Sequence, residues 1–153
     1  MHLPVTPALK KFLTARFGTD YRLSIDDWFG AIVLNVLQNK TNKHYEVLGR
    51  NKDVNKYKTE KFSITLSMST AEKSGFLFLP RHQASLHNIV DSIFREDMYI
   101  QALTNKTNYM IEYQTTIRNV LASYDITDEE MSYDSIKRDF ARKKKSLEDR
   151  LFL

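Results

Sequence analysis

Near its C-terminus the chain reads Ile126-Thr-Asp-Glu-Glu-Met-Ser-Tyr-Asp-Ser-Ile-Lys-Arg-Asp-Phe-Ala-Arg-Lys-Lys-Lys145. Apolar residues recur through this stretch at helical spacing. Between Lys137 and Lys145 it also holds six basic residues and a single acid, Asp139. One predicted helix therefore joins a small apolar stripe to a dense block of positive charge. This combination is typical of an element that meets a polyanion.

The wider segment from Thr115 to Lys145 predicts a helix, a tight connection, a short helical turn and a final helix that starts near Ser132. Thr127 and Glu130 have the spacing of a capping box, which supports the short turn. The residues expected to form the small core of this segment are Ile117, Val120, Leu121, Ile126, Met131, Tyr133, Ile136 and Phe140. The order of elements indicates a helix-turn-helix-like unit, whose last helix lies in the major groove of DNA.

In that interpretation, basic side chains of the last helix neutralise phosphates and the polar residues at its start lie closest to the bases. The candidate nucleic-acid-binding residues are Ser132, Tyr133, Ser135, Lys137, Arg138, Arg142, Lys143, Lys144 and Lys145, with Asp134 among them. A secondary basic patch is expected from Lys52, Lys56 and Lys58, in a lysine-rich segment that reads as a long loop or β-ribbon. The alternative is a solvated basic helix that only keeps the protein soluble.

The pattern from Ile126 to Lys144 is similar to the tail of small uncharacterised proteins of phages and mobile elements. The segment from Gly75 to Met98 also resembles the part that precedes this tail. The resemblance covers about half of the chain. It implies a phage or mobile-element origin and a role in handling DNA, and it identifies no catalytic residue.

The remaining sequence predicts a single domain of residues 1–153 with an α+β fold, mostly α-helical, a small antiparallel β element and the C-terminal helical unit. A mixed α/β part is expected over residues 1–80 and a helical part over residues 81–153. Expected strands are Tyr21–Ile25, Phe62–Met68 and Gly75–Pro80. Expected helices are Pro7–Phe17, Trp28–Leu37, Leu86 to about Ile100, and Tyr109–Leu121, with a break at Asn105–Asn108. Ser24 and Asp26 are candidate N-caps for the second helix.

Composition narrows the functional class. The 153 residues are 42% hydrophobic and 27% charged, which are ordinary values for a soluble globular protein. The sequence has no cysteine, so disulfides, thiolate metal sites and thiol nucleophiles are excluded. It contains no apolar run long enough to cross a bilayer and no secretory signal pattern. A cytoplasmic protein without a membrane partner is expected.

No constellation of residues indicates catalysis, a metal site or a cofactor. His82 and His87 are five positions apart, which is poor geometry for joint metal ligation on a helix. His87 and Asp91 are interpreted as a surface pair. The leading hypothesis is a non-enzymatic protein that binds double-stranded DNA, with a homodimer seam as a further interpretation of the helices after Pro80. The alternative is a structural, assembly or adaptor protein that binds another protein through its long amphipathic helices.

Overall fold

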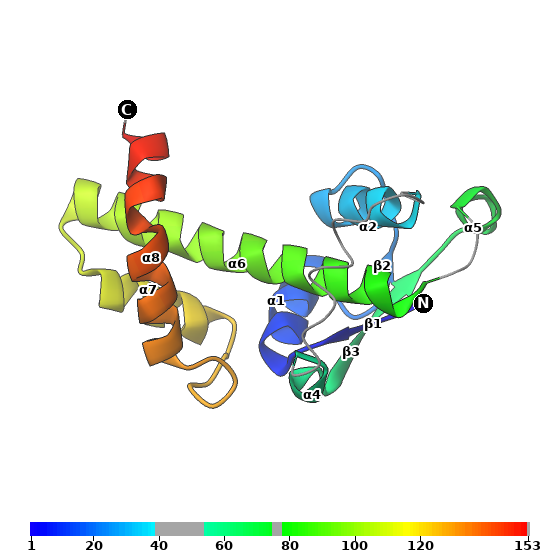
Figure 1. Ribbon diagram of the computed structural model, residues 1–153, viewed down its shortest axis with the longest axis horizontal. Coiled ribbons are helices and arrows are strands. Elements are labelled where there is room, and N and C mark those ends of the chain that lie inside the picture. Colours follow the sequence, from blue (N-terminus) through cyan, green and yellow to red (C-terminus); the bar gives the residue numbers. More distant parts are fainter. Residues whose placement is uncertain (39–53, 75–77, 153) are drawn as a thin grey trace. The chain divides into compact units, whose positions relative to one another are not determined.

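The computed structural model describes residues 1–38, 54–74 and 78–152 (Figure 1). Its contacts gather into two compact units, Met1–Asp91 and Ser92–Leu153. Helices account for most of the described residues, and the described strands form one small three-stranded sheet in the first unit. The mostly α-helical α+β fold expected from the sequence is therefore confirmed.

The sheet of the first unit is mixed. Its order is β1-β3-β2, where β1 is His2–Val5, β2 is Tyr21–Arg22 and β3 is Glu60–Thr65. β1 pairs with β3 antiparallel and β2 pairs with β3 parallel, so the small β element that was expected to be antiparallel is a mixed sheet. β1 is missing from the sequence-based prediction because it has four residues and contains Pro4, which a strand accepts at the edge of a sheet.

Apolar side chains alternate along β1 and β3 and form the base of the first core. Leu3, Val5, Phe62 and Ile64 are all buried. Helix α1, Pro7–Phe17, packs on β3. The helix begins as the sequence predicts, with Thr6 as N-cap and proline at the first helical position, and ends at Gly18. Gly18 has φ 79°, a left-handed conformation that suits glycine.

Helix α2, Trp28–Gln38, is capped by Asp27, so the predicted caps Ser24 and Asp26 are wrong. The Asp27 carboxylate accepts hydrogen bonds from the Gly30 amide (2.7 Å) and from the Tyr21 hydroxyl (2.8 and 2.9 Å). Burial and the bond to Asp27 raise the pKa of Tyr21. Gly30 leaves no room for a larger residue, because an added Cβ would lie 1.8 Å from the Ser24 carbonyl oxygen.

The chain after α2 departs from the prediction in three places. Helix α4, Val54–Tyr57, lies within the segment expected to be a loop or ribbon, whose residues 39–53 are outside the described part. Strand β3 ends at Thr65, and helix α5, Met68–Ser74, follows it. Residues 75–77 of the last expected strand are also outside the described part, but Phe78 and Leu79 are not in a strand. Pro80 begins helix α6, where the His82 ring accepts a hydrogen bond from the Leu79 amide.

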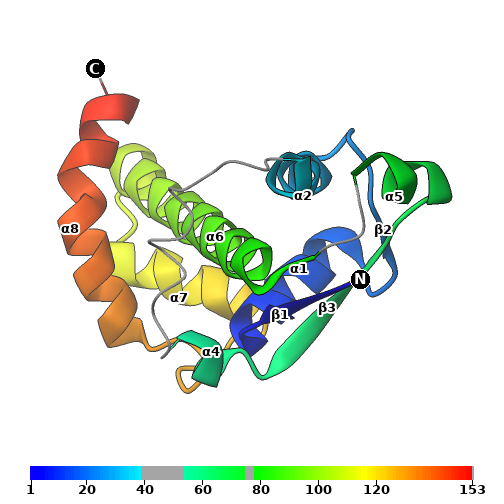
Figure 2. The same cartoon turned by 45° about the vertical axis from the view of Figure 1, so that its right-hand side comes forward.

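The second unit consists of the later part of α6 (Pro80–Tyr109), α7 (Tyr113–Ser123) and α8 (Tyr133–Leu151). α6 continues through the break expected at Asn105–Asn108. Asn105 is accommodated because its amide donates to the Thr116 hydroxyl at 3.2 Å. The helix ends instead at Tyr109, and Met110 follows it with a φ of 57°. Helix α8 crosses α7 at a steep angle in both views of the protein (Figure 1 and Figure 2). The core expected here is confirmed, except that Tyr133 is only half-buried.

Candidate nucleic-acid interface

Helix α8 is anchored to its unit along one face. Ile136, Phe140 and Leu147 are buried, and they recur at the spacing of a single helical stripe. The Phe140 ring packs against Tyr99 and Tyr113, with 5.2 Å between ring centroids in each pair. The opposite face of α8 is therefore presented to solvent by a fixed apolar support.

The start of α8 is also fixed. The Ser132 hydroxyl accepts a hydrogen bond from the Ser135 amide at 3.3 Å, which makes Ser132 the N-cap. Upstream, Thr127 and Glu130 form the predicted capping box: each side chain accepts a hydrogen bond from the other residue's amide. The connection from α7 to α8, residues 124–132, is longer than the turn of a compact helix-turn-helix motif.

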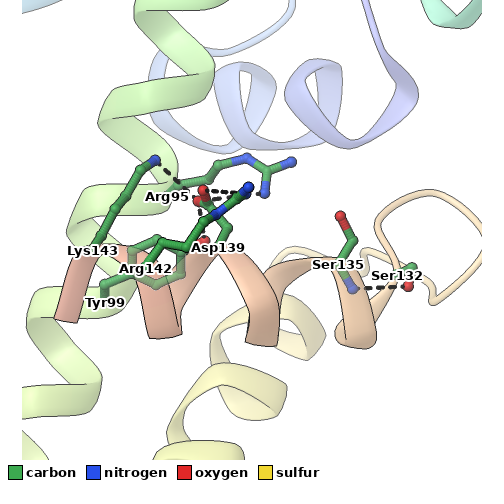
Figure 3. A network of polar contacts seen from close by, with 7 residues as sticks. All are labelled: Arg95, Tyr99, Ser132, Ser135, Asp139, Arg142 and Lys143. Carbon is green, nitrogen blue, oxygen red and sulfur yellow. Dashed lines mark hydrogen bonds and ion pairs between the residues drawn. The ribbon is translucent and has the colours of Figure 1, made fainter.

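Three of the six predicted phosphate-binding cations are paired with carboxylates of α8 itself. Arg142 and Lys143 both contact Asp139, at 3.2 and 3.0 Å, and Lys144 lies 3.7 Å from Glu148. Figure 3 shows Arg142 and Lys143 converging on Asp139. The pairs differ in exposure, because the Arg142 side chain is 76% exposed and that of Lys143 is 47% exposed. Since an exposed ion pair contributes little, Arg142 remains able to exchange Asp139 for another anion.

Asp139 is the centre of a polar network that ties α8 to α6. Its carboxylate accepts a hydrogen bond from the Tyr99 hydroxyl at 2.7 Å and lies 3.9 Å from Arg95. Burial alone would raise the pKa of Asp139, but the hydrogen bonds from Tyr99 and Lys143, together with the Arg95 charge, hold it below its usual value. Burial of the Tyr99 side chain and its hydrogen bond to Asp139 raise the pKa of Tyr99. Asp139 is thus an ionised group that fixes the position of α8.

The other three cations point outward. Lys137, Arg138 and Lys145 are exposed, and none has an ionic partner among the residues that the structure describes. Arg138 and Lys145 lie seven positions apart, so they occupy one face two turns apart. Ala141 lies between them on this face. We call Lys137, Arg138, Arg142 and Lys145 the outer cationic face of α8.

At the start of α8, Tyr133 makes contacts within the unit that the sequence did not predict. The guanidinium of Arg118 lies over the Tyr133 ring, 4.8 Å from its centroid, and the Tyr133 amide donates to Asp128 at 2.9 Å. Ser135 is exposed at the end of the first turn. Asp134 is exposed beside it and would repel a phosphate placed there. Ser132 and Tyr133 are therefore engaged within the unit, whereas Ser135 is exposed.

The charge of the outer face is local. Over residues 92–153 the sequence has ten basic and eleven acidic residues, so the second unit as a whole carries no net positive charge. Helix α8 alone has seven basic residues and four acids over Tyr133–Leu151. Any contact with phosphates must therefore be short-range and centred on α8.

The secondary patch belongs to the other unit. Lys56 is exposed, Lys58 is half-buried, and Lys52 lies outside the described residues. Burial lowers the pKa of Lys58.

His87 and Asp91 are not a surface pair, because His87 is only 5% exposed. Burial and the charge of Lys58 lower the pKa of His87, while Asp91 opposes the shift. His87 lies beside Leu86 and Val90, so the helix face that holds it is part of the first core. In the described part of the chain, no three His, Asp or Glu side chains could hold a metal ion together.

Sequence reasoning missed Arg95 and Tyr99, the two partners that α6 contributes to the Asp139 network. The pairs within α8 could have been found, because Arg142 and Lys143 follow Asp139 by three and four positions. The partners on α6 carry no such signal, since they are about 40 residues away in sequence.

Comparison of the sequence with protein-family models, with curated proteins and with solved structures found no match. The similarity of the C-terminal pattern to phage and mobile-element proteins stays a prediction. None of the helices in the described ranges combines the length and the hydropathy needed to cross a bilayer.

Proposed function

We propose that this protein binds double-stranded DNA through the outer cationic face of α8 and catalyses no reaction, acting as a regulator or accessory factor. The proposal rests on the difference between the cations of α8 that form ion pairs and those that do not. Lys137, Arg138 and Lys145 extend from a helix that is anchored on its opposite face, without an ionic partner in the described part of the chain. Ordered, unpaired cations on a supported helix are what phosphate binding requires.

The shape of α8 supports insertion into a groove. An α-helix with its side chains is about 10–12 Å in diameter, which suits the roughly 12 Å width of the major groove. The 19 residues of α8 give it a length of about 28 Å. Ala141 lies at the middle of the outer face, so the helix can approach the DNA closely between Arg138 and Lys145. Arg142 adds a fourth contact if it leaves Asp139 for a phosphate.

The number of contacts predicts the salt dependence of binding. Four phosphate contacts give a slope of about −3.6 in a plot of log K against log salt, from about −0.9 for each phosphate. This is a shallower dependence than six contacts would give, because Lys143 and Lys144 are engaged within α8.

The test is fluorescence anisotropy with a labelled duplex between about 50 and 200 mM salt. The variant Lys137→Gln, Arg138→Gln, Lys145→Gln should bind weakly, with a slope near −0.9 because only Arg142 remains. The matched control replaces three exposed cations of the first unit, Arg22, Lys61 and Arg81, with glutamine. The control loses the same net charge and should keep the wild-type slope. Equal losses in both variants, or a wild-type slope near zero, would reject the proposal.

The described residues give less support to the adaptor alternative and to the homodimer seam. Both need apolar surface on α6 and α7. Most apolar positions predicted for such a surface are buried within the fold, although Tyr109 at the end of α6 is 70% exposed. The buried positions include Leu86, Val90, Phe94 and Met98 of α6 and Ile117, Val120 and Leu121 of α7. These two ideas stay predictions, and the DNA-binding function is the one that the exposed groups of α8 favour.

A further inference from the structure

A pocket of about 390 Å³ lies in the second unit, between α7, the connection that follows it and the start of α8. A volume of this size falls within the range of small-molecule sites, about 300–1,000 Å³. None of the four residues of the outer cationic face lines the pocket. Its lining residues all belong to one unit, and they are Arg118, Leu121, Ile126, Asp128, Tyr133 and Asp134.

The apolar part of the pocket results from the way in which α7 ends. The Asp125 amide donates to the Ala122 carbonyl at 3.0 Å, and the Ile126 amide donates to the Leu121 carbonyl at 2.9 Å. These two bonds form a Schellman motif, in which Asp125 takes the left-handed position with φ 56°. Such a motif brings together the apolar side chains at its two ends, here Leu121 and Ile126. Both are buried and line the pocket, and we call them the apolar floor.

The pocket also contains charged groups of both signs that do not pair with one another. The Arg118 guanidinium lies over the Tyr133 ring, 4.8 Å from its centroid. The side-chain amide of Gln114, a neutral group, lies 3.2 Å from two of the guanidinium nitrogens. In the part of the chain that the structure describes, no ion pair includes Arg118, Asp128 or Asp134. The positive charge of Arg118 is therefore positioned by neutral groups and is not balanced by a carboxylate.

The two carboxylates of the pocket lie at the start of α8. One oxygen of Asp128 accepts a hydrogen bond from the Tyr133 amide at 2.9 Å, so its second oxygen is able to accept from another donor. Asp134 is exposed in the first turn of the helix. The helix dipole favours acids at this end, but it does not explain the guanidinium of Arg118 in the same pocket.

These charges select the chemistry of a ligand. The pocket has one positive and two negative side chains, which gives a net charge of −1. A simple anion would meet two carboxylates, and a simple cation would meet a guanidinium. A molecule with one carboxylate and two ammonium groups complements all three side chains. Its aliphatic part can pack on the apolar floor while its charged ends stay at the polar groups.

We propose that this pocket binds a free basic α-amino acid of the lysine type. The carboxylate of the amino acid pairs with Arg118, whose fork of donors matches a carboxylate in two parallel hydrogen bonds. Its two ammonium groups pair with Asp128 and Asp134, and its methylene chain lies over the apolar floor. The inference does not depend on the proposed function of α8.

The experiment is isothermal titration calorimetry of the whole protein with three probes that differ by one charged group. L-Lysine has the carboxylate and both ammonium groups, 1,5-diaminopentane lacks the carboxylate, and L-norleucine lacks the side-chain ammonium group. L-Lysine should bind about tenfold more tightly than either analogue, because each analogue loses one charge-assisted contact. Equal binding of the three probes, or no binding of L-lysine, would overturn the proposal.

Substitutions then assign the contacts. Arg118→Gln should bind L-lysine and 1,5-diaminopentane equally, because the group that distinguishes them is lost. Arg118→Lys keeps the charge and should recover part of the preference for L-lysine, and it serves as a second variant if the glutamine form does not fold. Asp134→Asn should bind L-lysine about tenfold more weakly than wild type does.

Asp149→Asn is the matched control for the pocket, because it removes an exposed acid of α8 that does not line it. This control should bind L-lysine as wild type does. An equal loss in Asp134→Asn and Asp149→Asn would assign binding to the general charge of the helix and overturn the proposal. A wild-type preference for L-lysine in Arg118→Gln would also overturn it, because the carboxylate would then have another partner.

Discussion

Replacing Asp139 with asparagine should destabilise the protein and strengthen its binding to DNA at the same time. The side chain is 13% exposed and its carboxylate contacts Tyr99, Lys143, Arg142 and Arg95. Asparagine can still accept the Tyr99 hydrogen bond, but it offers no charge. A hydrogen bond to a charged group contributes about 1.5–3 kcal/mol, against about 0.5–1.5 kcal/mol for a neutral one. With the exposed Arg142 pair discounted, the expected loss is about 2 kcal/mol.

Thermal unfolding followed by circular dichroism measures this loss. At this chain length, about 2 kcal/mol corresponds to a fall of about 6 °C in melting temperature near neutral pH. The folded protein holds the pKa of Asp139 below its ordinary value of 3.8. The stabilisation is therefore fully present above pH 3.8 and is lost as the pH falls through the folded-state pKa. The difference between wild type and Asp139→Asn should shrink in the same acid range.

Asp149→Asn is the control, because it removes an exposed acid from the same helix and should leave the melting temperature unchanged. On DNA, Asp139→Asn releases Lys143, so the slope against log salt should become steeper by about 0.9. Equal melting temperatures for wild type and Asp139→Asn near neutral pH would refute the argument that this carboxylate fixes α8. A difference that persists unchanged in acid would refute the assignment of the effect to its charge.

Three further substitutions test the packing. Gly30→Ala should cost about 3 kcal/mol or more, because the new Cβ would meet the Ser24 carbonyl; a variant with wild-type urea stability would contradict this. Phe140→Ala should cost about 3–5 kcal/mol and loosen α8 from Tyr99, as measured by urea unfolding and by hydrogen exchange of α8 amides. Wild type should lose stability as the pH falls below about 6.5, because unfolded His87 binds a proton that the folded form resists, whereas His87→Gln should show less of this loss in melts between pH 7 and 5.

The fold was predictable wherever apolar residues recur over several helical turns. The core positions of α7 and α8 and the capping box at Thr127 follow from spacing alone. Short elements were not: β1 has four residues, and its pairing with β3 joins segments about 60 positions apart. The end of α6 was misplaced because asparagine is typical of a helix break, so that the sequence predicts an end at Asn105. The helix is followed instead by Met110, and methionine is not a residue type that marks a turn.

The positive charge of the candidate site was predictable from the sequence, but the ion pairs and hydrogen bonds of its residues were not all predictable. The basic residues of α8 are visible in the sequence, and the same-helix partners of Asp139 follow from their spacing. The link from Asp139 to Tyr99 depends on how α8 packs on α6, which no local pattern encodes. For this reason the sequence overstates the number of cations that can meet a phosphate.

The boundary between the two units falls inside α6, between Asp91 and Ser92, and not in a linker. Successive helical turns share hydrogen bonds from each residue to the fourth one before it, so a cut at this point would leave unpaired amides and carbonyls on both fragments. Leu86 and Val90 belong to one core, and Phe94 and Met98 to the other. A truncated form meant to isolate either half should therefore keep the whole of α6, and melting of one half should weaken the other through the backbone they have in common.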